Sequence, residues 1–175
     1  DPCKLLAQAD LERALGKPIK SASAAHDQNT GSKGCFYLND PGKSFVIVTY
    51  WQGDDAKLQL LGTIAQLQKG CDSFSGGGTT RRVTPTPVPP AVAALKTKSL
   101  VELYGTHAQL WKEKCPPGRG LDLSGLGEGA SMDPVVGTAH MVAGEVYLVF
   151  FLADSALTEQ KRIEGVRLLA ASLFK

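Results

Sequence analysis

Apolar residues recur at helical spacing in three stretches of the chain. The first begins at Asp1–Pro2, an N-cap followed by a proline at the first helical position, and Gly16 is placed to end it. The second covers 54–69 and the third 158–174. The spacing therefore predicts three helices with one apolar face each. The apolar positions are Leu5, Leu6, Leu11 and Leu15; Ala56, Leu60, Ile64 and Leu67; and Ile163, Val166, Leu169 and Leu173.

Strands are predicted where β-branched and aromatic residues gather between turn residues. The expected strands are 35–38, 44–51, 128–132, 136–142 and 145–153. An Asn-Asp-Pro-Gly turn at 39–42 joins the first two, and Ala143–Gly144 joins the last two. The strand at 44–51 is apolar on both faces, which predicts a place inside the sheet. Residues 20–33 are polar and rich in turn formers, so we expect a loop there.

The middle of the chain is rich in glycine and proline from 71 to 90, and we predict an ordered excursion over about 71–119 with one strand at 80–83. Residues 91–114 have helical composition, interrupted near Lys98 or Gly105. Hairpins followed by helices occur on both sides of this excursion. The predicted fold class is therefore α+β, an antiparallel sheet of hairpins with helices packed on one face, in a single domain over 1–175.

Composition narrows the class of protein. The chain has 175 residues, 43% hydrophobic and 21% charged, with a net charge of +2. Basic pairs occur only at 81–82 and 161–162, without interleaved aromatic residues, which argues against nucleic-acid binding. The longest apolar run, 146–153, is far shorter than the roughly 20 residues that span a bilayer. The chain starts without Met, and together with its dispersed cysteines this leads us to expect a removed signal peptide, with contact to a membrane only through a possible lipid anchor upstream.

The four cysteines, Cys3, Cys35, Cys71 and Cys115, are dispersed and contain no CxxC pair. This pattern predicts two disulfide bonds in an oxidising compartment, outside the cytoplasm, and no metal site. Three pairings are possible from the sequence. Sequential pairing is favoured because it would fix the N-terminal segment to the first strand and close the Gly/Pro-rich excursion.

The motifs at both ends of the chain resemble a family of secreted bacterial lipoproteins of unknown function, common in actinobacteria. The opening Asp-Pro-Cys-Lys-Leu-Leu at 1–6, Ala-Leu-Gly at 14–16, Cys-Phe-Tyr at 35–37 and Gly-Leu-Gly-Glu-Gly-Ala at 125–130 carry this resemblance. It covers the first seventy or so and the last fifty or so residues, and leaves the excursion out. The resemblance implies a cell-envelope location, an α+β fold and a Cys3–Cys35 bond, and it implies no activity.

Candidate catalytic motifs are weak. The glycines at 125–129 match neither a dinucleotide nor a P-loop motif and precede a predicted strand, so a tight turn is the better interpretation. Ser131 lacks the second glycine of a hydrolase elbow, and His140 could serve as its base only if Asp133 or Asp154 oriented it. We predict no catalytic residues and no cofactor.

The expected function is a non-catalytic cell-envelope domain with a binding or accessory role. Its partner would be a protein or a small apolar or cell-wall ligand, and Tyr104 and Trp111 in the excursion are the candidate contact residues. The alternatives are a hydrolase assembled from distant residues, Ser131 and His140, or a purely structural spacer. A polar cleft with these two side chains within hydrogen-bond reach would favour the hydrolase.

Overall fold

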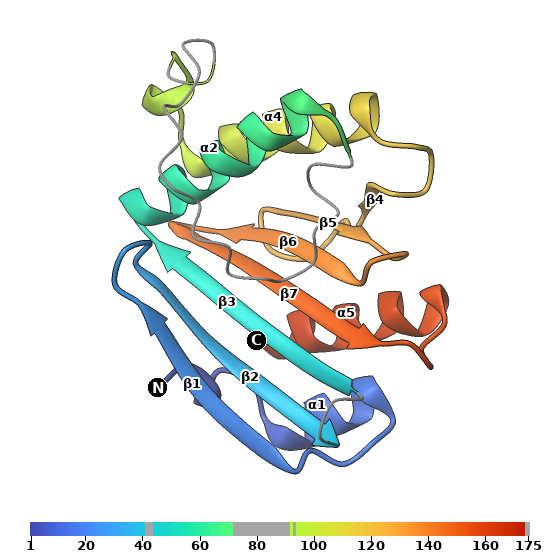
Figure 1. Cartoon of the computed structure of the whole chain (residues 1–175). Helices are drawn as coiled ribbons and strands as arrows, with labels where there is room; N and C mark the ends of the chain where they lie inside the picture. The colour runs from blue at the N-terminus through green and yellow to red at the C-terminus, as the bar shows by residue number, and fades with distance from the viewer. Residues whose placement is uncertain (41–43, 72–91, 93, 174–175) are drawn as a thin grey trace.

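A single antiparallel sheet joins both halves of the chain in the computed structural model, which describes residues 1–40, 44–71, 92 and 94–173 (Figure 1). Its strand order is β1-β2-β3-β7-β6-β5-β4. The strands are β1 (Ser21–Asp27), β2 (Ser32–Asp40), β3 (Ser44–Gln52), β4 (Leu121–Asp122), β5 (Gly129–Asp133), β6 (Thr138–Ala143) and β7 (Val146–Asp154). The helices are η1 (Pro2–Lys4), α1 (Gln8–Leu15), α2 (Asp54–Lys69), η3 (Ala94–Thr97), α4 (Leu100–Lys114) and α5 (Glu159–Leu173). The α+β class is confirmed.

The sheet is apolar on both faces at its centre, where β3 pairs with β7 along nine residues. Val46, Val48 and Phe150 pack into a core with α1 and α5. The residues that alternate with them, Trp51 and Tyr147, pack into a second core with α2 and α4. The helices therefore cover both faces, and the prediction of helices on one face is wrong. A strand with two apolar faces needs cover on each side.

The predicted loop at 20–33 is also wrong, because β1 occupies 21–27 and β2 begins at Ser32. Six of the seven residues of β1 are exposed and the seventh is half-buried. This edge strand is held by backbone pairing with β2 and has no alternating apolar pattern that sequence analysis could find.

The first predicted helix divides into two parts, η1 and α1. The Asp1 side chain accepts a hydrogen bond from Cys3 N at 2.9 Å, as a capping residue would, but the turn ends at Lys4. Cys3 is bonded to Cys35 on β2, and the Tyr37 hydroxyl donates to the Cys3 carbonyl oxygen at 3.2 Å. These contacts fix the first turn on the sheet, and α1 ends at Gly16 as predicted.

Both predicted disulfides, Cys3–Cys35 and Cys71–Cys115, are present. The predicted interruption near Lys98 is confirmed, because Ser99 caps α4 in a capping box with Glu102. Gly105 lies within α4 and does not interrupt it. The strand predicted at 80–83 lies outside the described residues.

Candidate functional site

A pocket of about 340 Å³ lies between α4 and the segment from 120 to 131. One wall is a face of α4, where Tyr104, Ala108 and Trp111 follow each other at helical spacing. The volume falls within the range of about 300–1,000 Å³ that small-molecule sites occupy. The two candidate contact residues, Tyr104 and Trp111, thus line one pocket.

Glycine allows the segment 120–131 to lie directly against these aromatic rings. A Cβ on Gly120 would come within 3.2 Å of the Trp111 ring, and one on Gly129 would overlap the Tyr104 ring. Gly125 and Gly127 have φ angles of 86° and 58°, in the left-handed region that favours glycine. The tight turn predicted for this motif is confirmed, and close packing on Tyr104 is a further reason for glycine.

Replacing Gly129 with alanine should destabilise the protein, because the new methyl group forces Tyr104 away from β5. Overpacking of this kind costs about 1–3 kcal/mol. The matched control is Gly105→Ala within α4, where nothing lies within 4 Å of the new Cβ. That variant should gain about 0.4–1 kcal/mol. Urea unfolding of both variants measures the difference, and equal stabilities would contradict the proposed contact.

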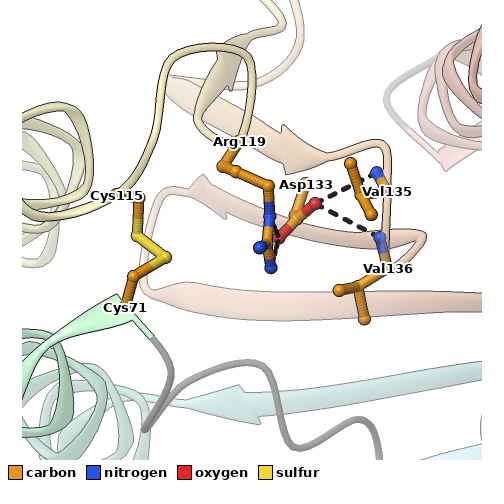
Figure 2. Close-up of a disulfide and its surroundings, with 6 residues drawn as sticks. All are labelled: Cys71, Cys115, Arg119, Asp133, Val135 and Val136. Atoms are coloured by element: carbon orange, nitrogen blue, oxygen red, sulfur yellow. Dashed lines mark hydrogen bonds and ion pairs between the residues drawn. A yellow bond between two sulfur atoms is a disulfide. The ribbon is translucent and has the colours of Figure 1, made fainter.

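Two connections anchor the chain that leads into the pocket wall (Figure 2). Cys115 ends α4 and is bonded to Cys71, directly after α2. Four residues later, the Arg119 guanidinium forms an ion pair with Asp133 at the end of β5. The segment is then held on the sheet by a hydrogen bond from Leu123 N to the Ala130 carbonyl oxygen at 2.9 Å. The wall is therefore fixed at its start and along its length.

The exposed rim of the pocket carries three charges, on Lys112, Asp122 and Glu128. One Glu128 oxygen accepts a hydrogen bond from Gly144 N at 2.7 Å, which directs this carboxylate over the β6–β7 turn. Two carboxylates against one ammonium group give the rim a small negative excess.

Two histidines lie behind the pocket in an aromatic cluster. The rings of His107 and His140 are 5.2 Å apart, and each is 5.2 Å from the ring of Trp111. Burial lowers the pKa of His107 to about 3. Burial, with a smaller contribution from the charge of His107, holds the pKa of His140 well below its ordinary value. Both rings are therefore neutral near pH 7.

The candidate hydrolase pair is close in space. Ser131 and His140 are directly opposite each other on β5 and β6, and Ser131 lines the pocket. His140 Nδ1, however, shares a hydrogen bond of 2.6 Å with the Tyr147 hydroxyl. Burial raises the pKa of Tyr147, so its hydroxyl is a neutral phenol. His140 Nδ1 therefore bonds a neutral group where a catalytic triad would have a carboxylate.

The two acids considered as orienting groups are engaged elsewhere. Asp133 accepts from Arg119 and from the backbone N–H groups of Val135 and Val136 (Figure 2). Asp154 forms an ion pair with Lys17 at 2.7 Å and accepts from Ala156 N at 2.8 Å. Neither of these two acids is placed to orient His140, so neither supplies the third member of a triad.

The place of His107 beside the pocket and the proximity of Tyr104 to Ser131 were not predicted from the sequence. His107 and Tyr104 lie on one face of α4, three residues apart, but the register of 91–114 was not evident from the sequence. Pairing of β5 with β6 in one register brings Ser131 beside His140, and a one-residue shift would separate them.

Within the described ranges, no helix is long and apolar enough to cross a membrane. The same part of the chain contains no group of three or more His, Cys, Asp or Glu side chains that could hold a metal ion. Comparison with protein-family models, with curated proteins and with solved structures finds no match for this chain.

Proposed function

We propose that this protein is a non-catalytic binding domain of the bacterial cell envelope, and that the pocket between α4 and the segment 120–131 holds a small ligand. The observation that carries the proposal is the construction of the pocket. Its two aromatic residues, Tyr104 and Trp111, pack on glycines, and a disulfide and a partly buried ion pair anchor its other wall. Preorganised pockets of this kind bind ligands at low entropic cost.

The location is supported by the two disulfides, which persist in oxidising compartments. The resemblance to secreted lipoproteins agrees with this location.

A hydrolase is the second candidate, because Ser131 lies in the pocket and opposite His140. The engagement of Asp133 and Asp154 disfavours it, and a spacer role does not account for a pocket.

The test is a fragment screen by NMR on the whole chain, with backbone amide shifts as the readout. Bound fragments should shift the amides of 104–112 and 120–131 most. Ala108→Phe, which fills the pocket from α4, should abolish these shifts. Gln109→Phe, one residue further along and exposed, is the matched control and should leave them unchanged. Absence of any fragment that maps to this pocket would overturn the proposal, and ester turnover that depends on Ser131 would replace it with the hydrolase.

A further inference from the structure

The two edge strands of the sheet differ in how they are protected against pairing with another chain. At one edge β4 is only two residues long, whereas at the other edge β1 pairs with β2 along all seven of its residues (Figure 1). Natural sheets protect their edges with very short strands, β-bulges, proline or lysine. The strand β1 contains none of these, because its register with β2 is regular throughout and its sequence is Ser-Ala-Ser-Ala-Ala-His-Asp.

The outer side of β1 is open to a further strand. Six of its seven residues are exposed. Within the described ranges, its backbone is hydrogen-bonded to β2 and to no other element. The N–H and C=O groups that point away from β2 are therefore left to water, and the small side chains on both faces allow another backbone to approach closely.

An apolar hollow of about 250 Å³ adjoins the middle of this strand, and Pro2, Ala24 and His26 are among the residues that border it. Ala24 lies directly opposite Cys35 on β2, so the two side chains share one face of the sheet. The Cys3–Cys35 bond holds η1, which contains Pro2, against that face. A strand added to the edge would cover the hollow and remove apolar surface from water, which favours association.

We infer that β1 pairs antiparallel with β1 of a second copy of this chain, with Ala24 of each copy on the two-fold axis. This is the symmetric antiparallel pairing that uses all seven residues. It places Ser21 opposite Asp27, where a hydroxyl can donate to a carboxylate, and this contact occurs twice. Ala22 lies opposite His26, and no like charges face each other. The same axis brings the two apolar hollows together.

The dimer should be weak and leave the ligand pocket open. Seven residues from each copy are far fewer than the about 20–30 a side of a standard stable interface, so association should need a high protein concentration. The pocket is lined by residues of β4 and β5, at the opposite edge of the sheet. Pairing through β1 is thus independent of the proposed function.

Sedimentation equilibrium of the whole chain, from about 10 μM to about 1 mM, tests for the dimer. We expect the average mass to rise from that of one chain toward that of two. Ala24→Lys places two ammonium groups opposite each other at the axis and should weaken association at least about threefold. Gln109→Lys on the exposed face of α4 adds the same charge elsewhere and should leave association unchanged. Equal weakening by the two variants would overturn the inference. A single chain at the highest concentration would also overturn it and leave this edge to a strand of another protein.

Two cysteine variants test the register. Residues directly opposite in an antiparallel pair have Cα atoms about 4.5–5.5 Å apart, within reach of a disulfide. Under oxidising conditions Ala24→Cys should therefore give a covalent dimer on a non-reducing gel. Ala22→Cys is equally exposed on the same face, but the two copies of residue 22 would lie four strand positions apart, about 13 Å. It should cross-link at least tenfold more slowly, and equal or faster cross-linking would overturn the pairing.

Discussion

Replacing both Cys71 and Cys115 with alanine should lower the free energy of unfolding by about 4 kcal/mol. The bond closes a loop with a sequence separation of 44 residues. In the loop-entropy model, closure of such a loop stabilises the fold by about 4 kcal/mol, through restriction of the unfolded chain. Guanidinium unfolding under non-reducing conditions, compared with the unsubstituted protein, measures this loss.

The same variant should also weaken ligand binding in the pocket. Cys115 is the first anchor of the segment that continues through Arg119 to the pocket wall (Figure 2). Without the bond, α4 and α2 keep their packing but the start of this segment is no longer fixed. The ligand must then order this segment when it binds, at a cost in free energy. In the unsubstituted protein the disulfide already holds the segment in place, so this cost does not arise on binding.

The control is the double variant Cys3→Ala and Cys35→Ala. This bond has a sequence separation of 32 residues and joins η1 to β2, away from the pocket-lining residues. Its loss should cost a similar amount of stability, just under 4 kcal/mol in the same model. Fragment shifts in the pocket should stay as they are. Equal losses of binding in the two double variants would show that the Cys71–Cys115 bond has no particular role in positioning the wall.

Sequence patterns predicted those helices and strands that have regular apolar spacing and clear turn residues of their own. The hairpin of β6 and β7 and helices α2 and α5 have regular apolar spacing and clear turn residues, and all appear within a few residues of their predicted limits. The strand β3 carries apolar residues on both faces, and this correctly indicated a place inside the sheet, where β3 lies between β2 and β7. The same two-faced pattern was the available sign that helices cover both sides of the sheet.

Other features depend on contacts that no local pattern records. The strand β1 forms because its backbone pairs with β2, although its residues are mostly small and exposed. The pocket depends on the register of β5 against β6 and on which face of α4 meets Gly129. Tyr104 and Trp111 were predicted as contact residues from their type and place. Their juxtaposition with Ser131 required the fold.

Acidification should destabilise the protein through the two buried histidines. The pKa of His107 falls to about 3 in the folded protein, and that of His140 lies well below its ordinary value, because both rings are buried. In the unfolded chain both would titrate near pH 6.5. As the pH falls below about 6.5, the unfolded chain binds protons that the folded protein excludes, so stability is lost in this direction and regained as the pH rises.

The expected size of this pH effect follows from the number of protons that bind only when the protein unfolds. Each histidine that is protonated only on unfolding shifts the folding equilibrium about tenfold per pH unit, so two shift it about a hundredfold per unit below roughly pH 5.5. Urea unfolding at pH 7, 6, 5 and 4.5 measures the slope. Between pH 7 and about pH 5 few carboxyl groups titrate, so the histidines dominate the slope in that interval.

His107→Gln keeps a buried polar side chain of similar size and removes one titration. The slope below pH 5.5 should then fall to about tenfold per pH unit. The matched control is His26→Gln on the exposed edge strand β1, which removes a histidine outside the core and should keep the slope of the unsubstituted protein. If His107→Gln retains the full slope while it remains folded at pH 7, acid sensitivity arises elsewhere in the molecule, and the cluster of His107, His140 and Trp111 does not set the lower pH limit of this fold.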